Sequence, residues 1–491
     1  MDSSLASPRR LSPSRTRVFI VAACVVTGAL AGALTALLDP LFVLPLIPLA
    51  AAGVWGLRSP ERALWLLVAA IALLPRIASP VSIGFKPTVV DAGLALFLLA
   101  WLVDRARGSR HGASAGLSPV VAVPLVGLVF VAVATFIVGV PNGALTTLVL
   151  RRFAELILTL LATFWMTKVL ADATARQLVV RAFLLAGALA GLIGLVLYVT
   201  SALTAERVLS ALRPFGYPYG NGVVRYVRDD PSLLRRATGL WIDPNAYGGF
   251  LLVTASVCLP QLFTRKPVLP RGIVALCVGV MGAALVATIS RGAMLGLAAV
   301  GIGIAVLRYR RLLPLLLVAV AAALILPQTR ELIAHFADGF ALRDAASQMR
   351  LGEYKDAFRL IERYPIFGVG FADTPDVDLY IGVSNMYLLI AQQMGLMGLA
   401  FFAAVIVGFF IRAGQAARVA LARHPSAALP DVTVDIWIGA CGGVCGALLS
   451  GIFDHYFFNI DFHNAVMLFW IVLALAMATS HTILSHDAAK S

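Results

Sequence analysis

Long apolar segments recur along this chain and limit what it can fold into. Most are close to the ~20 residues that a helix needs to cross the hydrocarbon core of a bilayer, some, such as 41–56 and 62–75, are shorter, and together they extend from Arg17 to His481. The segments are continuous rather than alternating, which excludes a transmembrane β-barrel. We therefore expect an all-α, polytopic membrane protein, a bundle of about 12–14 transmembrane helices. The predicted spans lie near residues 17–38, 41–56, 62–75, 87–103, 119–140, 152–171, 182–203, 246–263, 272–289, 292–308, 312–327, 386–411, 434–453 and 463–481.

The charged residues are few and unevenly placed. They make up 13% of the 491 residues, against about 25% in soluble domains, and the formal net charge is +14. Lys and Arg gather in alternate short loops, as the positive-inside rule requires of cytoplasmic loops, so much of this excess needs no nucleic-acid partner. The predicted orientation places tails 1–16 and 482–491 in the cytoplasm. It assigns 17–203, 246–327 and 386–481 to the membrane, and 204–245 and 328–385 to extracytoplasmic loops.

The second of these loops, 328–385, is the longest polar interval of the chain. Residues 345–364 within it predict a helix that ends before Pro365. Its apolar positions recur at helical spacing, and they are Leu351, Tyr354, Phe358 and Ile361. Two interpretations follow. The helix lies on the bilayer surface as an amphipathic segment, or it covers a cavity and directs Arg350 into it.

The first loop is rich in arginine and ends where the next span begins, at Pro244-Asn245. We expect Asn245 to cap the free backbone N–H groups of that helix. Another arginine, Arg291, stands at a polar break between two apolar segments, directly after Ser290. An arginine at such a place is costly unless it is paired or faces a water-filled cavity, so Arg291 either extends to the interface or serves a function.

The five cysteines all fall inside apolar segments, and they are Cys24, Cys258, Cys277, Cys441 and Cys445. A buried thiol behaves as a small hydrophobic group. We therefore expect no disulfide and no metal site from these residues.

Three groups of motifs follow one another in the second half of the chain. The first is Arg236-x-x-Gly239 with Pro244-Asn245, and the second is Ser290-Arg291-Gly292. The third comprises Arg350, Pro365-Ile-Phe-Gly368-Val-Gly370, Asn385-x-Tyr387-Leu388 and Gly395-Leu-Met-Gly398. In this order and at these places in the predicted topology, the set resembles the O-antigen ligase and polysaccharide polymerase family of bacterial membrane glycosyltransferases.

The resemblance implies a GT-C-like helical bundle with a loop lid, in the bacterial cytoplasmic membrane. It implies a donor glycan on undecaprenyl pyrophosphate, transferred at the outer face to a glycan or lipid-glycan acceptor, without a nucleotide cofactor or a required metal. By the same resemblance, the arginines that hold the donor pyrophosphate are Arg236, Arg291 and Arg350. We count Glu353 with them as a candidate catalytic residue. Our candidates for substrate binding are Arg225, Arg228, Asn245, Gly368, Gly370, Ser384 and Asn385. The two glycines could offer backbone N–H groups to a phosphate or simply form a tight turn.

One position departs from the family pattern. Family ligases carry a His directly before the Asn-x-Tyr-Leu run, whereas this chain has Ser384 there. A serine hydroxyl cannot act as a general base at neutral pH, although an imidazole can. The alternative base candidates are His335, His455, His463 and Asp454, with Asp243 and Glu353 as further carboxylates. Otherwise the departure marks a subfamily, such as a repeat-unit polymerase.

A protein of another class would use similar residues. A transporter or flippase for a lipid-linked polyanionic glycan could line its path with the same arginines. Transporters tend to carry internal repeats and broken helices at mid-membrane, whereas the polar residues here gather at one predicted surface, which favours the enzyme. A relative that transfers sugar to a protein acceptor would carry the same sequence features.

Overall fold

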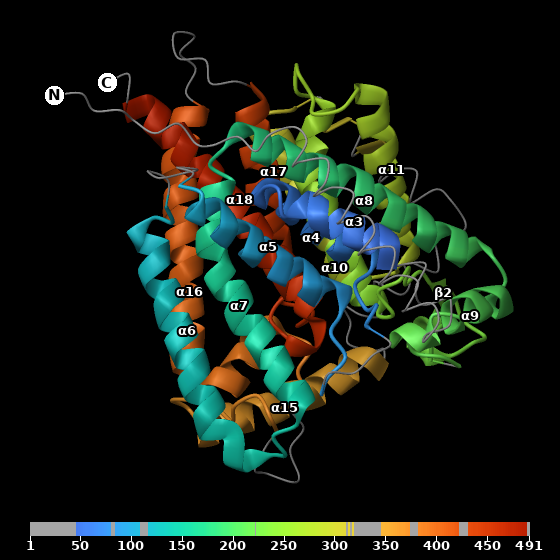
Figure 1. The fold of residues 1–491 in the computed structure, drawn as a ribbon. Helices are drawn as coiled ribbons and strands as arrows, with labels where there is room; N and C mark the ends of the chain where they lie inside the picture. Colours follow the sequence, from blue (N-terminus) through green and yellow to red (C-terminus); the bar gives the residue numbers. More distant parts are fainter. Residues whose placement is uncertain are drawn as a thin grey trace, which may run out of the picture. The chain divides into compact units, whose positions relative to one another are not determined.

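The structure is a computed structural model that describes residues 46–79, 84–108, 116–220, 222–310, 313–314, 317–318, 345–373, 382–421 and 431–488. The chain divides into two compact units, Met1–Trp55 and Gly56–Ser491. In the first unit the described part belongs to helix α3 (Leu46–Gly56). The second unit carries the rest of the fold and the candidate site, and it is the unit described below (Figure 1).

Helices make up nearly all of the regular structure. They are α4 (Pro60–Leu73), α5 (Val89–Ala106), α6 (Pro119–Gly139), α7 (Thr147–Val169), α8 (Ala173–Val199), α9 (Ala202–Ser210), α10 (Pro244–Cys258), α11 (Arg271–Ala287), α12 (Arg291–Leu307), α15 (Ala345–Arg363), α16 (Met386–Ala420), α17 (Asp431–Ser450) and α18 (His463–Ala488). The described strands are β1 (Arg225–Tyr226) and β2 (Arg235–Arg236), which form one short antiparallel hairpin. The predicted all-α fold is confirmed.

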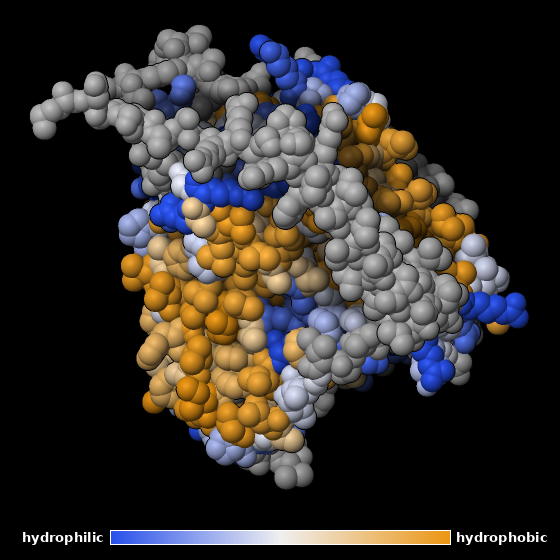
Figure 2. Space-filling view, viewed as in Figure 1, coloured by the Kyte–Doolittle hydropathy of each residue, from blue (hydrophilic) through white to orange (hydrophobic). Residues whose placement is uncertain are grey.

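Five of the described helices are long and apolar enough to cross a membrane: α6, α8, α16, α17 and α18. The apolar helices α11 and α12 are shorter. Figure 2 shows a broad apolar surface on the side of the bundle where α6 lies, with polar residues toward its two ends. The protein is therefore an integral membrane protein. The predicted spans near 17–38 and 312–327 fall outside the described residues or nearly so.

Helix α18 forms the centre of the bundle. Its side chains are buried almost without interruption from His463 to Ser480, and it packs against α7, α16 and α17. Small residues allow such close packing where lipid supplies no hydrophobic drive. On α17, for example, a Cβ added at Gly439 would overlap the backbone of Val257 in α10. Helix α18 also continues to Ala488, past the predicted end at 481.

Helix α15 lies across one end of the bundle in Figure 1, beside the start of α16. The predicted apolar stripe is only partly right. Ala357 and Leu360 are fully buried, whereas Leu351 and Phe358 are exposed. The helix turns its small and aliphatic positions toward α16 because Val383 and Leu389 form the complementary surface there. It therefore covers the bundle end with one face and presents a second apolar face outward.

Candidate functional site: an arginine pocket

A polar pocket of about 110 Å³ opens at the end of the bundle that α15 covers. The β1–β2 hairpin, the first residues of α10 and α12, α15 and the segment after α17 all contribute to it. We call it the arginine pocket, and its lining residues are Val227, Arg228, Arg236, Asn245, Ile289, Ser290, Arg291, Gly292, Arg350, Ser450, Phe453, Asp454 and Tyr456. The three arginines of the sequence motifs, spread along the chain from position 236 to position 350, thus line one cavity.

Arg236 is held rigidly at the pocket wall. Its Nε donates to the carbonyl oxygen of Thr288 at 2.9 Å, and its Nη2 donates to Asn245 Oδ1 at 2.5 Å. Burial lowers the pKa of Arg236 to about 10, although Asp243 and Asp454 oppose the shift. The guanidinium therefore stays charged at neutral pH. It links the end of α11 to the start of α10 while facing the cavity.

Arg291 is the first residue of α12, so a helix N-terminus and a guanidinium meet at the same wall. The side chain of Ser290 makes no cap hydrogen bond to the first turn. Free N–H groups and the helix dipole make such an end a favourable place for an anion. The preceding Ile289 has φ of 54°, a strained conformation for a β-branched residue. Strain of this kind is commonly stored at functional sites.

Arg350 reaches the pocket from α15, and Glu353 fixes this helix in place. The Oε2 atom of Glu353 accepts a hydrogen bond from the backbone N–H of Ser384 at 2.9 Å. Asn385 caps α16, because its Oδ1 accepts from the N–H groups of Tyr387 and Leu388. Its Nδ2 donates to the carbonyl of Ile452. Glu353, Ser384 and Asn385 do not line the pocket, but their bonds connect two of its walls, α15 and the segment after α17.

Of the other arginines predicted to bind substrate, Arg228 lines the pocket. Arg225 pairs with Arg236 in the hairpin register and forms an ion pair with Asp229, with 3.4 Å between Nη2 and Oδ1. The prediction that Asn245 caps α10 was wrong. Asp243 is the cap, accepting from the N–H groups at 245 and 246, because Pro244 occupies the first helical position. Asn245 instead orients Arg236.

Gly368 and Gly370 have left-handed φ values of 64° and 86°. Their N–H groups donate within the protein, to the carbonyl oxygens of Tyr364 at 3.0 Å and Gln393 at 2.9 Å. These donors are used, so the geometry favours the tight-turn interpretation over a phosphate contact. The turn inserts into a break of α16 at Gly395, whose φ is 65°, and the Leu396 N–H donates to the carbonyl of Pro365.

We predict that Gly395→Ala destabilises the protein. The left-handed backbone there costs about 1–3 kcal/mol for other residues, and an added Cβ would overlap the carbonyl of Ile366. Thermal unfolding in detergent should show a lower midpoint. Gly414→Ala, at an open position of the same helix, is the matched control and should not lower it. Equal midpoints for the two variants would contradict the docking role of this break.

Asp454 is the base candidate that the fold brings into the arginine pocket. Burial raises its pKa and Asp243 adds to the rise, while His455 and Arg350 oppose it. Its neighbour Tyr456 also lines the pocket and shares a hydrogen bond of 2.6 Å with Ser450. His455 lies beside the pocket and bonds to Asn459 through Nδ1. His335 lies outside the described residues.

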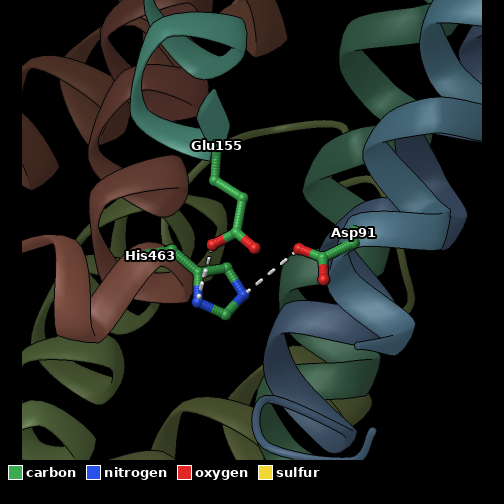
Figure 3. A group of neighbouring side chains, drawn as sticks. All are labelled: Asp91, Glu155 and His463. Atoms are coloured by element: carbon green, nitrogen blue, oxygen red, sulfur yellow. Dashed lines mark ion pairs between the residues drawn. The ribbon is translucent and has the colours of Figure 1, made fainter. Parts of the chain in front are cut away.

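His463 is buried away from the arginine pocket, between two carboxylates (Figure 3). Its Nδ1 lies 3.4 Å from Glu155 Oε2, and its Nε2 lies 3.8 Å from Asp91 Oδ1. These three residues have the composition of a metal site. However, each carboxylate faces a different ring nitrogen, whereas a single ion binds one of them, and Arg151 Nε already lies 3.0 Å from Glu155. The geometry fits an ion network that joins α5, α7 and α18.

The sequence interpretation missed Glu155, and it missed the pocket residues Ser450 and Tyr456. A carboxylate inside an apolar segment is by itself a signal of a specialised site, and Glu155 lies in such a segment, one helical turn after Arg151. Ser450 and Tyr456 carried no comparable signal, because a hydroxyl at a helix end is common in any membrane protein.

Residues 276–403 match the protein family described as O-antigen ligase. The matched segment includes Arg291, Arg350 and Glu353, whereas Arg236 and Asp454 lie on either side of it. No curated protein matches the chain.

Proposed function

We propose that this integral membrane protein, whose residues 276–403 match the O-antigen ligase family, transfers or polymerises a glycan carried on undecaprenyl diphosphate. The reaction takes place in the bacterial cytoplasmic membrane, at its outer face. The acceptor is a sugar hydroxyl of a second glycan or lipid-linked glycan. The observation that carries the proposal is the meeting of Arg236, Arg291 and Arg350 in one pocket.

The chemistry of the leaving group supports this assignment. A diphosphate gains negative charge as the glycosidic bond breaks, and guanidinium groups match its oxygens in charge and geometry. The N-terminus of α12, with Arg291 as its first residue, adds backbone donors to the same wall. Groups that are fixed in place before the reaction stabilise developing charge most effectively, and Arg236 is fixed by two hydrogen bonds.

Asp454 is the base that we assign to the acceptor. The acceptor hydroxyl oxygen attacks the anomeric carbon of the donor, and the bond from that carbon to the diphosphate oxygen breaks with its electron pair. The hydroxyl proton passes to the carboxylate of Asp454, which lines the same pocket as the arginines. This assignment supplies the base that Ser384 cannot provide.

Glu353 acts as a positioning residue for Arg350. Glu353 lies about one helical turn from Arg350 on α15, and it accepts a hydrogen bond from the Ser384 N–H. Loss of this bond therefore releases α15 beside the pocket. We expect Glu353→Ala to raise the donor KM several-fold, with a smaller effect on kcat. Glu353→Gln keeps an acceptor oxygen and should restore the KM. Glu362→Ala, at an exposed position of the same helix, is the control. Equal kinetics for the Ala and Gln variants at 353 would contradict this role.

The decisive test of function uses the purified protein in detergent with an undecaprenyl-diphosphate-linked glycan as donor and acceptor. We expect longer glycan products together with released undecaprenyl diphosphate, and no requirement for a nucleotide. Addition of a chelator tests metal dependence in the same assay. If no product forms and the donor instead crosses the bilayer of protein-containing liposomes, the protein is a flippase and the proposal is wrong.

A further inference from the structure

Helix α15 carries more apolar surface than the bundle covers. At 3.6 residues per turn, its apolar side chains form one stripe around about half of the helix. Along one edge of this stripe, Ala357 and Leu360 are fully buried against the start of α16 and the turn after α15. Tyr354 lies between the two edges and is half-buried. Along the other edge, Leu351 and Phe358 are exposed, Phe358 by 59%. The bundle therefore leaves one edge of the stripe uncovered.

The turn after α15 adds to this exposed apolar surface. Ile366 is 58% exposed, and Phe367 beside it is exposed as well. The turn is held against the C-terminal end of α6, because the Nδ2 atom of Asn142, in the short segment directly after α6, donates to the carbonyl oxygen of Val369 at 2.9 Å. The position of the two exposed side chains is thus set by α6.

Helix α6 shows where the hydrocarbon of the membrane ends. It is one of the helices that can cross a membrane, and its 21 residues are about the length that a span requires. Its last apolar side chains, Ile137 and Val138, are exposed, and a Cβ added to the next residue, Gly139, would overlap the backbone of Gly370 in the turn. The turn therefore lies at the depth where α6 leaves the hydrocarbon, and α15 leads directly into it.

We propose that the uncovered face of α15 and its turn docks into the leaflet of the bilayer next to the arginine pocket. We call it the docking face, and its residues are Leu351, Phe358, Ile366 and Phe367. Lipid is the occupant that fits, because the turn adjoins the lipid-facing end of α6. The charged residues that border the face, Lys355 and Glu362, are exposed, so they can stay among the headgroups while the apolar side chains enter the acyl chains.

Docking fixes the height of α15 relative to the membrane surface. The same helix carries Arg350 into the arginine pocket, so the guanidinium is held close to the headgroup layer. A diphosphate attached to a lipid chain lies in that layer, and it reaches Arg350 without leaving the membrane. This consequence rests on the proposed function, whereas the docking itself follows from the exposed apolar residues and the contact with α6.

The test measures what surrounds the docking face. Phe358→Cys carries an environment-sensitive fluorophore in protein reconstituted into phospholipid nanodiscs. Quenching by nitroxide-labelled lipids should be about threefold stronger there than at Gly352→Cys, and quenching by aqueous iodide should be weaker by a similar factor. Gly352 is the matched control, because it is exposed on the polar side of α15 and no atom lies within 4 Å of an added Cβ. Phe130→Cys, on the exposed apolar surface of α6, gives the value for full contact with lipid, and the labelled unchanged protein gives the background of the native cysteines.

Ile366→Cys should match Phe358→Cys, since both positions belong to the docking face. If iodide quenches positions 358 and 352 equally, the face lies in water and the inference is wrong. If neither quencher reaches position 358, protein covers the face instead of lipid, and the inference is wrong as well. All labelled positions are exposed, so the variants should elute as the unchanged protein does. The measurement uses no donor, so a protein that docks but transfers no glycan would refute the proposed function alone.

Discussion

Arg291→Ala and Arg350→Ala should each lower glycan transfer by about 10²–10³-fold, the effect of removing one fixed charge-stabilising donor from an active site. Both side chains line the arginine pocket. The loss should fall mainly on kcat, because the negative charge on the diphosphate oxygens grows as the glycosidic bond breaks. The measurement is the rate of product formation by purified variants that elute as folded protein. Lysine at either position keeps the charge but not the bidentate contact, and should restore only part of the rate.

Matched controls separate loss of the pocket from loss of positive charge. Arg359 lies on the same helix as Arg350, but its side chain is 62% exposed and lies 3.5 Å from Asp356. Arg359→Ala should retain the full rate. If Arg359→Ala and Arg350→Ala reduce transfer equally, the effect belongs to the charge of α15 and not to a diphosphate in the pocket.

Asp454→Asn should lower kcat by about 10²–10⁴-fold, the range for removal of a general base, while the donor still binds. Asparagine keeps the size of the side chain and can still accept a hydrogen bond from the His455 N–H, as Asp454 Oδ1 does at 2.8 Å. Asp461→Asn is the control in the same segment, since Asp461 pairs with Arg152 and does not line the pocket. Asp461→Asn should leave kcat within a few-fold of the unchanged protein.

The pH profile gives a second measure of Asp454. Burial raises the pKa of this carboxyl above its usual range near 4. The base form is present only above that raised pKa, so activity should fall as pH decreases through it. Asp454 has several charged neighbours in the fold, namely Asp243, His455, Arg236 and Arg350. The Asp454→Asn variant is therefore needed to assign the acidic limb of the pH profile to Asp454. Asp454→Asn should lack the acidic limb, and an identical limb in the variant would assign it to another group.

The sequence predicts the helices well because their cause is local. An apolar segment of about 20 residues is sufficient to predict a span, and the described helices from α4 to α18 correspond to predicted spans, except for α9 and the lid helix α15. The motifs around Arg291 and Arg350 also predicted the resemblance to the O-antigen ligase family, whose model matches residues 276–403. The apolar segments and the ordered motifs can both be read from the sequence without knowing which helices are neighbours.

The arrangement within the site depends on contacts between distant segments. The sequence offers Asp454 as one of several base candidates, and only the fold brings the segment after α17 to the start of α12 in one pocket. The break at Gly395 looks like an ordinary glycine in an apolar helix, yet it receives the turn that begins at Pro365. Likewise, asparagine is a common helix cap, but Asp243 caps α10, and Asn245 instead accepts a hydrogen bond from Arg236.

The arginine pocket should recognise a diphosphate, and equilibrium binding of undecaprenyl diphosphate, the released product, tests this recognition without catalysis. The unchanged protein should bind the diphosphate at least tenfold more tightly than undecaprenol, with an affinity that falls as salt is added. Arg291→Ala should remove most of that difference. Equal affinity for the diphosphate and the alcohol, or an unchanged preference in Arg291→Ala, would contradict the account.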